Sequence, residues 1–286
     1  MTARARPFRQ LDVFTDRAGY GNPLAVVLDG SGLDDAAMQR FAAWTNLSET
    51  TFLLPPTQNS ADYRVRIFTP GGELPFAGHP TLGSCHAWLA AGGVPRQPHG
   101  IVQECAAGLV HVRRSDQGLV FAAPPLRRSV PAAGLLSRVA GALGLRPAQV
   151  LAAQLLDNGP VWLALQIDSR LAVQRLAPDH AALRALNHKV GVVHVDPAAG
   201  ADAAQPALTV RAFAAPSGIP EDPVTGSLNA SLAQWLIAES RAPERYVASQ
   251  GEALGRAGRV QVERDAGGQV WIGGGCVDCI EGTVRL

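Results

Sequence analysis

The chain has 286 residues, of which 47% are hydrophobic and 17% are charged, a composition typical of a globular protein with a sizeable core. Its 25 basic and 24 acidic residues leave a net charge of +1 without a basic stripe or an acidic tail, so nucleic acids and membrane surfaces are poor candidates as partners. The stretch MTARARPFRQLDVF has no apolar run after its arginines, so no secretory signal is expected. With only four cysteines, a cytoplasmic protein is expected.

Apolar or alternating stretches separated by Gly, Pro and Asn turns predict a series of strands in the first half of the chain. These are FRQLDVFT (8–15), NPLAVVLD (22–29), TTFLLPP (50–56), YRVRIFTP (63–70), GIVQECA (100–106), GLVHVRR (108–114) and GLVFAAPP (118–125). Between the second and third strands, LDDAAMQRFAAWTN repeats apolar residues at helical spacing, with Asp34 or Asp35 placed to cap the helix.

The loose stretch PPLRRSVPAA, residues 124–133, is the best candidate boundary between two halves. We therefore predict an N-terminal half over 1–127 and a C-terminal half over 128–277, with strand 278–286 packing back on the first half. The second half contains a short amphipathic helix (133–145), strands at 161–167 and 208–215, an exposed loop at 196–206 and a helix from Pro223. These elements indicate an α+β fold whose strands are mostly antiparallel.

The two halves share a short pattern. HPTLGS begins at His79 and DPVTGS begins at Asp222, and each continues as a small-then-apolar helix that reaches a tryptophan. Upstream, GNPLAVV and NGPVWLAL are both turns that lead into an apolar strand. Three matches in the same order predict an internal duplication, although two common strand–turn–helix units could also match by coincidence.

A residue before proline at a helix start is placed to be the N-cap, since proline is favoured at the first helical position. Asp222 is a good N-cap, which is the simpler interpretation of that residue, whereas His79 is not a preferred cap. Each helix start offers unpaired N–H groups and about half a positive charge, which suits a substrate carboxylate. His79 and Asp222 would then carry protons beside that anion. Glu49, in NLSETTF, would on its own be a solvated charge at the start of a strand.

Taken together, NLSETTF, IFTPGGELPFAGHPTLG and IPEDPVTGS resemble the PhzF-like family of phenazine biosynthesis, and GYGNPLAVV and SQGEALGRAGRVQVE extend the likeness over nearly the whole chain. The resemblance implies a diaminopimelate-epimerase-like fold, with two pseudo-symmetric halves that each wrap a curved, mostly antiparallel sheet round a central helix. It also implies a homodimer and an isomerase that needs no cofactor and moves a proton on a small anionic substrate held in the cleft between the halves.

The resemblance assigns the family's functional residues to positions in this chain. Its catalytic Glu, His and Asp fall on Glu49, His79 and Asp222. Its substrate-binding serine falls on Ser227, and the N–H groups that bind the substrate carboxylate fall near Gly78 and Gly226. In the implied mechanism Glu49 removes a proton from carbon and returns it elsewhere, a contribution of about 10²–10⁴-fold to the rate.

Related epimerases and proline racemases use two cysteines at the helix starts, and this chain has neither. Cys85 lies deeper in its helix and is expected in the core, and the CxxC of Cys276 and Cys279 lies in a strand-like stretch, so no metal is expected. Two alternatives remain open from the sequence. The chain could be an epimerase or racemase with bases on opposite sides of its substrate, or a non-catalytic anion-binding module.

Overall fold

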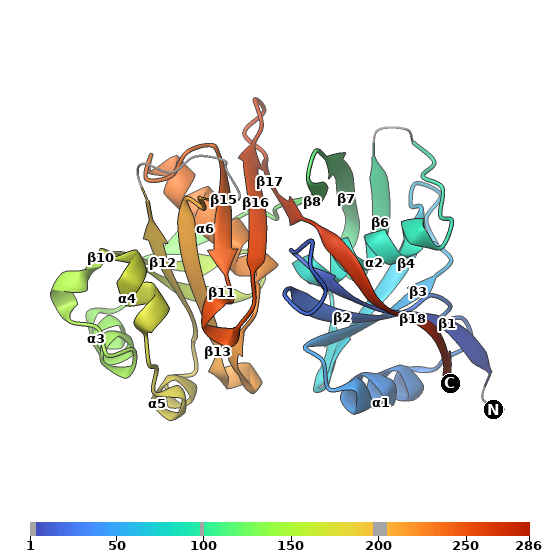
Figure 1. Cartoon of the computed structure of the whole chain (residues 1–286), viewed down its shortest axis with the longest axis horizontal. Helices are drawn as coiled ribbons and strands as arrows, with labels where there is room; N and C mark the ends of the chain where they lie inside the picture. Colours follow the sequence, from blue (N-terminus) through green and yellow to red (C-terminus); the bar gives the residue numbers. More distant parts are fainter. Residues whose placement is uncertain (1–3, 98–99, 197–204) are drawn as a thin grey trace. The chain divides into compact units, whose positions relative to one another are not determined.

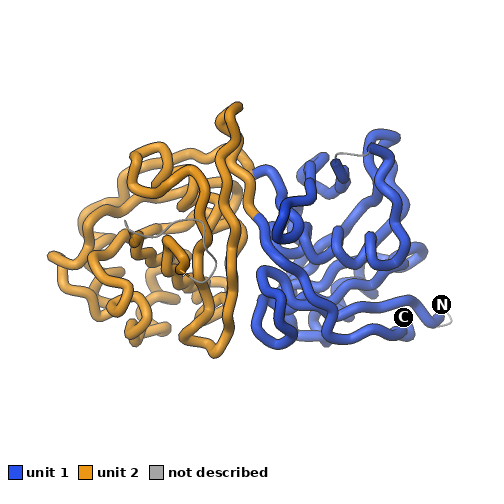
Figure 2. The backbone as a smooth tube through the Cα atoms, turned by 45° about the horizontal axis from the view of Figure 1, so that its top comes forward, with its two compact units in different colours: residues 1–122, 273–286 blue, residues 123–272 orange. Residues whose placement is uncertain are grey.

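A computed structural model describes residues 4–97, 100–196 and 205–286 of the chain. The chain divides into two compact units, drawn in two colours in Figure 2. Unit 1 comprises Met1–Ala122 and Gly273–Leu286, and unit 2 comprises Ala123–Ile272. The predicted boundaries follow residues 127 and 277, and each lies five residues beyond the boundary found in the structure (127 − 122 and 277 − 272).

In unit 1 the C-terminal strand pairs antiparallel with the first strand, so two segments from opposite ends of the sequence lie side by side in the sheet (Figure 1). β18 (Cys276–Arg285) pairs with β1 (Ala5–Val13), which pairs antiparallel with β2 (Asn22–Val27). β2 is parallel to β3 (Glu49–Leu54), which is antiparallel to β4 (Tyr63–Thr69). β4 then pairs antiparallel with β5 (Gly72–Leu74) and parallel with β6 (Ile101–Cys105), and β7 (Gly108–Ser115) and β8 (Gly118–Ala122) follow as antiparallel neighbours.

Helices cover both faces of this sheet, because successive strand residues point to opposite sides. On one face α1 (Asp35–Thr45) packs Met38, Phe41 and Ala42 against Val27, Phe52 and Phe68. On the other face α2 (Gly78–Ala90) lies so close to β1 and β2 that a Cβ on Gly83 would fall 2.5 Å from Leu24 Cδ2 and 3.0 Å from Leu11 Cδ1. The glycine inside α2 is therefore needed for contact between helix and sheet.

Unit 2 shows the same succession of strand pairings. Its strands are β9 (Arg127–Ser129), β10 (Val150–Asp157), β11 (Val161–Ile167), β12 (Lys189–Val195), β13 (Leu208–Ala214), β14 (Ile219–Asp222), β15 (Arg245–Gln250) and β16 (Gly258–Arg264). β17 (Val270–Gly274) begins in this unit, and its last two residues belong to unit 1. The first three pair antiparallel in the order β9–β10–β11, β11 is parallel to β12, and β12 is antiparallel to β13. β13 pairs antiparallel with β14 and parallel with β15, which is antiparallel to β16.

Helices again lie on both faces of the second sheet. α3 (Ala133–Ala142), α4 (Arg170–Arg175) and α5 (His180–Ala185) cover one face, where a core cluster includes Leu163, Leu165 and Val190. The central helix α6 (Gly226–Ala238) has ten buried residues and lies on the other face, where its Leu228 would meet a Cβ on Gly191 at 2.5 Å. Short 3₁₀ turns complete the unit at Pro147–Gln149, Ala215–Ser217 and Glu252–Leu254.

The structure confirms a mixed fold of extensive sheet and few helices, and it confirms the strands and the α1 helix predicted in the first half. Asp34 is the N-cap of α1, accepting a hydrogen bond from the Ala37 N–H at 2.8 Å. The stretch predicted as a loose boundary contains β9, because Arg127–Ser129 pairs with β10. Of the loop expected at 196–206, residues 197–204 lie outside the described part of the chain.

The predicted starts of the two central helices were wrong. α2 begins at Gly78 after Ala77, and Pro80 is its third residue, where the missing N–H costs no helical hydrogen bond. Asp222 is not an N-cap, because its backbone belongs to β14 and is paired with Ala212. α6 begins later, at Gly226 after Thr225. The equivalent positions at the two helix starts are thus Gly78 and Gly226, and not Gly83 and Gly226.

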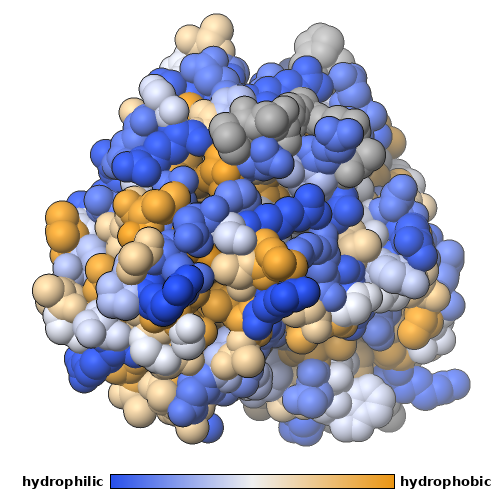
Figure 3. All heavy atoms as spheres, turned by 60° about the vertical axis from the view of Figure 1, so that its left-hand side comes forward, coloured by the Kyte–Doolittle hydropathy of each residue, from blue (hydrophilic) through white to orange (hydrophobic). Residues whose placement is uncertain are grey.

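The surface of the described residues is mixed in character. On the face shown in Figure 3, apolar side chains lie scattered among hydrophilic ones. Large apolar side chains that are exposed include Trp44, Val94 and Val130. Within the described ranges, no helix combines the length and the apolar character that crossing a membrane would require.

Candidate active site

Glu49 occupies the first position of β3, directly after the loop that follows α1. Alternation along the strand sets its direction. Thr50 contacts α1 through Thr45, with 2.8 Å between the two hydroxyl oxygens, and Thr51 accepts a hydrogen bond from Ser84 of α2 at 2.9 Å. Glu49 shares the face of Thr51 and therefore points toward α2.

His79 meets Glu49 in the first turn of α2. The Nε2 atom of His79 lies 3.4 Å from Oε2 of Glu49, and the two side chains are 7% and 14% exposed. An imidazole and a carboxylate held together with little access to water are suited to moving a proton between carbon and a base. The structure thus brings together two of the predicted catalytic residues, which are separated by 30 positions in the sequence (79 − 49).

The start of α2 is short of side-chain partners for its backbone N–H groups. Ala77, the N-cap, makes no capping hydrogen bond through its side chain, and Gly78, the first helical residue, is buried. The positive end of the helix dipole favours a negative charge at this point. Glu49 and an anionic substrate group both match that preference.

Asp222 and Ser227 lie in unit 2, on either side of the short segment that joins β14 to α6. The Asp222 carboxylate accepts a hydrogen bond from the Thr225 hydroxyl at 2.7 Å. Ser227 is the second residue of α6, and its hydroxyl oxygen accepts a hydrogen bond from the Trp162 indole N–H at 3.1 Å. Asn158 donates to the Ser227 backbone oxygen at 3.0 Å, so the first turn of α6 is held by β11 and by the turn before it.

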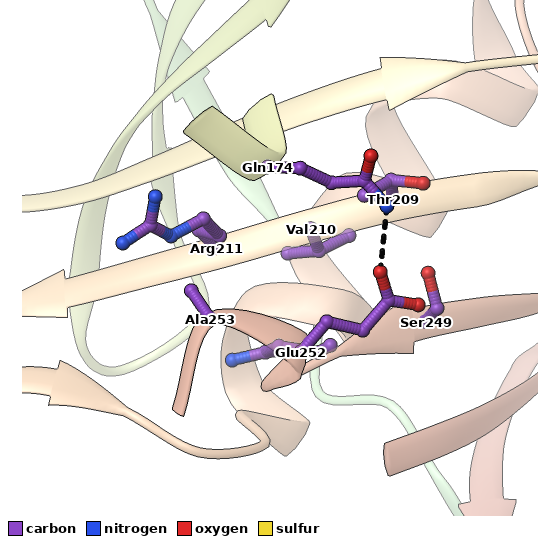
Figure 4. A pocket seen from close by; sticks show the side chains of 8 residues that line it. Gln174, Thr209, Val210, Arg211, Ser249, Glu252 and Ala253 are labelled. Carbon is purple, nitrogen blue, oxygen red and sulfur yellow. Dashed lines mark hydrogen bonds between the residues drawn. The ribbon is translucent and has the colours of Figure 1, made fainter. Parts of the chain in front are cut away.

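A hollow in unit 2 lies beside this region and is lined by residues of α4, β13, β15 and the turn at Glu252–Leu254 (Figure 4). Gln174 donates a hydrogen bond to Glu252 across it at 2.7 Å. Its volume of about 10 Å³ has room for roughly one water molecule, so it is no substrate site.

Comparison with known proteins decides the family. The family model described as phenazine biosynthesis-like protein, PhzC-PhzF, matches residues 11–282. The chain belongs to this family. A trans-2,3-dihydro-3-hydroxyanthranilate isomerase of Pseudomonas aeruginosa is 33% identical over 264 residues, covering 91% of this chain and 90% of the relative. The comparisons confirm the predicted PhzF-like family and the predicted class of enzyme, an isomerase.

Other members of the PhzF-like family match over similar lengths. A Schizosaccharomyces pombe relative named antisense-enhancing sequence 1 is 36% identical over 292 residues, covering 96% of this chain and 97% of its own. The crystal structure of a PhzF-family phenazine biosynthesis protein from Bacillus anthracis superposes with a TM-score of 0.85 at 23% identity, covering 99% of this chain and all of the other. That structural match shows the shared fold.

Cys85 is a core residue, as the sequence predicted, since its side chain is fully buried in α2. Burial raises the pKa of the Cys85 thiol to about 12. Burial also raises the pKa of Cys276 well above that of a free thiol. Only a thiolate is nucleophilic, so neither cysteine is suited to proton transfer or covalent catalysis at neutral pH.

We therefore expect turnover to resist thiol reagents. At pH 8 about one Cys85 side chain in 10⁴ is ionised when its pKa is near 12. Iodoacetamide should alkylate the exposed Cys279 first and reach Cys85 only after unfolding, which peptide mass spectrometry would follow alongside activity. Rapid inactivation that tracks Cys85 alkylation in the folded protein would contradict the core assignment.

Sequence reasoning singled out the segments around these sites but missed several residues in them. Trp162 and Asn158 both lie in the NGPVWLAL stretch, which was noted only as a turn leading into a strand. Gln250 lies in the SQG stretch, whose importance came only from the family likeness. Its burial and the φ of +95° at Gly251 appear only in the structure, so no signal in the sequence singled out this residue.

Proposed function

We propose that this PhzF-like protein is an isomerase that moves a proton on a small carboxylate-bearing substrate by general acid–base catalysis, without a cofactor. The observation that carries the proposal is the contact between Glu49 and His79, 3.4 Å apart and shielded from water at the start of α2. A carboxylate is a competent base for a carbon-bound proton when it is held within reach of that carbon. Glu49 is the base in this proposal, and His79 orients the substrate and shares the proton.

The substrate carboxylate binds, in this proposal, to backbone N–H groups near Gly78 and Gly226 and to the Ser227 hydroxyl. The hydrogen bond from Trp162 supports this role for Ser227. A hydroxyl has one donor and two acceptor sites, and the indole N–H can only donate, so Ser227 keeps its own proton for an anion. Asp222 completes the set by binding and orienting a polar group of the same substrate.

The repeated succession of strand pairings supports a duplication in which both units descend from one ancestral unit. In each unit an antiparallel run is followed by a parallel pair, and a central helix precedes the strand of the second parallel pair. The homodimer and the cytoplasmic location expected from the sequence stay predictions.

The first compound to test is the one that names the 33%-identical relative, trans-2,3-dihydro-3-hydroxyanthranilate, followed by a panel of small cyclic and acyclic carboxylates. We expect one of them to be converted to an isomer of unchanged mass by protein treated with a chelator, as judged by NMR and mass spectrometry. Loss of optical purity without a change of connectivity would establish an epimerase instead. Saturable binding of carboxylates with no turnover would establish an anion-binding module.

A further inference from the structure

Asp222 is held in place by its neighbours through a chain of hydrogen bonds. The Thr225 hydroxyl donates to Oδ2 of Asp222 at 2.7 Å. The same hydroxyl oxygen accepts from Nε2 of Gln250, a residue of β15, at 2.9 Å. Because a hydroxyl has a single proton, the bond from Gln250 directs that proton toward the Asp222 carboxylate.

Gln250 is buried, and four hydrogen bonds fix its side chain. Its Oε1 accepts from the Thr225 backbone N–H at 3.1 Å and from Asn229 Nδ2 at 2.8 Å. Its Nε2 donates to the Asp222 backbone oxygen at 3.1 Å, besides the bond to Thr225. The backbone N–H of Thr225 can only donate, so Oε1 must face it and the amide cannot be reversed.

The segment from Asp222 to Thr225 is also packed tightly against the strands. Gly251 follows Gln250 with φ of +95°, and a Cβ there would lie 2.6 Å from the Pro223 backbone oxygen. A side chain at this position would therefore push Pro223, and Asp222 with it, away from Gln250. Asp222 is therefore fixed by hydrogen bonds to its carboxylate and backbone, and the residue after it is fixed by close packing against Gly251.

Unit 1 contains the same pair of residue types with a different end point. Gln103 of β6 donates to the Thr81 hydroxyl of α2 at 2.9 Å, the distance found for Gln250 and Thr225. The Thr81 hydroxyl donates instead to the Ala77 backbone oxygen, four residues earlier, at 2.9 Å. Only in unit 2, among the described residues, does this glutamine–threonine pair deliver its proton to a carboxylate.

We propose that Thr225 and Gln250 are positioning residues that fix the plane of the Asp222 carboxylate for the substrate. A carboxylate has about four acceptor sites, and the bond from Thr225 takes one of them and constrains the orientation of the group. A hydrogen bond to an ionised group is stronger than a neutral one. The inference rests on the proposed function, in which Asp222 binds the substrate.

Two substitutions at Thr225 separate the hydroxyl from the methyl group. Thr225→Val keeps the shape and removes the hydroxyl, and we expect kcat/KM to fall about 10- to 100-fold. Thr225→Ser keeps the hydroxyl and should remain within about threefold of the wild type. If Thr225 contributed only packing, Thr225→Val would be the more active of the two variants. An active Val variant or an inactive Ser variant would therefore overturn the positioning role.

Gln250→Glu is a second variant that does not depend on the folding of Thr225→Val. It keeps the acceptor that faces the Thr225 N–H but replaces the donor with an oxygen, toward which the Thr225 hydroxyl would turn. We expect a loss of kcat/KM as large as that of Thr225→Val. Wild-type activity in a folded Gln250→Glu protein would overturn the inference.

Coupling to Asp222 provides a readout that needs no substrate. Thr225→Val should lower the thermal midpoint more in the wild-type background than in an Asp222→Asn background, because the bond to residue 222 is already weakened there, whereas the bond from Gln250 is lost in both. Thr81→Val is the matched control, and its shift should be the same in both backgrounds. Additive shifts for Thr225 would overturn its positioning role even if no turnover is ever found. Coupled shifts without turnover would support the positioning of Asp222 by Thr225 but refute the proposed function.

Discussion

Replacing Glu49 with Gln should lower turnover by at least about 10²–10⁴-fold, the usual contribution of a positioned general base. The amide keeps the size and shape of the side chain, but it cannot take a proton from carbon. The contact with His79 at 3.4 Å remains possible for an amide oxygen, so the fold and the binding of carboxylates should change little. Steady-state kinetics, thermal midpoint and calorimetric binding, measured on the same preparation, check the expectation.

Glu104→Gln is the matched control for this experiment. Glu104 is also a nearly buried carboxylate of unit 1, but its oxygens accept hydrogen bonds from the Thr57 hydroxyl, the Thr57 N–H and the Gln58 N–H. An amide can keep its oxygen on the two N–H groups and turn its N–H₂ to the Thr57 hydroxyl, but it loses the charge that strengthens these bonds, at a cost of about 1–3 kcal/mol. We expect the Glu104→Gln variant to be less stable than the wild type but to keep its turnover per folded molecule. A fully active Glu49→Gln enzyme would refute the role of Glu49 as the base.

Removing Glu221 should destabilise unit 2 by about 3–5 kcal/mol, because it would leave the Arg211 guanidinium buried without its carboxylate. The two residues form a bidentate ion pair with N···O distances of 2.9 and 2.7 Å, and their side chains are only 8% and 6% exposed. Arg211 also donates to the backbone oxygens of Val173 and Leu176 at the end of α4. The pair thus joins β13, β14 and α4 directly before Asp222. Glu221→Ala should lower the thermal midpoint by roughly 10 °C.

The exposed pair of Arg127 and Asp157 offers the comparison. Its N···O distance is 3.0 Å, but the arginine side chain is 87% exposed, so Asp157→Ala should cost no more than about 1 kcal/mol. The double replacement Arg211→Met with Glu221→Leu should recover much of the stability lost in Glu221→Ala, since no buried charge remains. Equal losses for Glu221→Ala and Asp157→Ala would show that burial of the pair contributes nothing.

Local patterns were enough to predict much of unit 1. Alternating residues and clear turns marked β1 to β4, and Asp34 marked the start of α1, because each of these signals depends on near neighbours in the sequence. Strand β10 gave no such signal. Its sequence, VLAAQLLD, reads equally well as helix, and it becomes a strand by pairing with β9 and β11. The starts of α2 and α6 were misplaced because a proline was taken as the first helical residue, whereas pairing with β13 commits Asp222 to the sheet.

The candidate site divides in the same way. Glu49 and His79 were predicted through the family motifs, and their contact then follows from strand alternation and the position of α2. Gln250 could not be predicted, because its partners at Asp222, Thr225 and Asn229 lie more than 20 residues away and meet it only when β15 pairs with β13. Long-range hydrogen bonds of this kind leave no periodic pattern in a sequence.

The pairing of β18 with β1 also sets the order in which the chain can fold during its synthesis. Unit 2 is one continuous segment, Ala123–Ile272, and all of its partners are available once that segment has left the ribosome. Unit 1 must wait, because β1 leaves the ribosome well before its partner, which spans Cys276–Arg285. Until then one edge of β1 has unpaired backbone groups that could pair with another nascent chain. The strand that closes this sheet is therefore synthesised after the whole of unit 2, long after the strand with which it pairs.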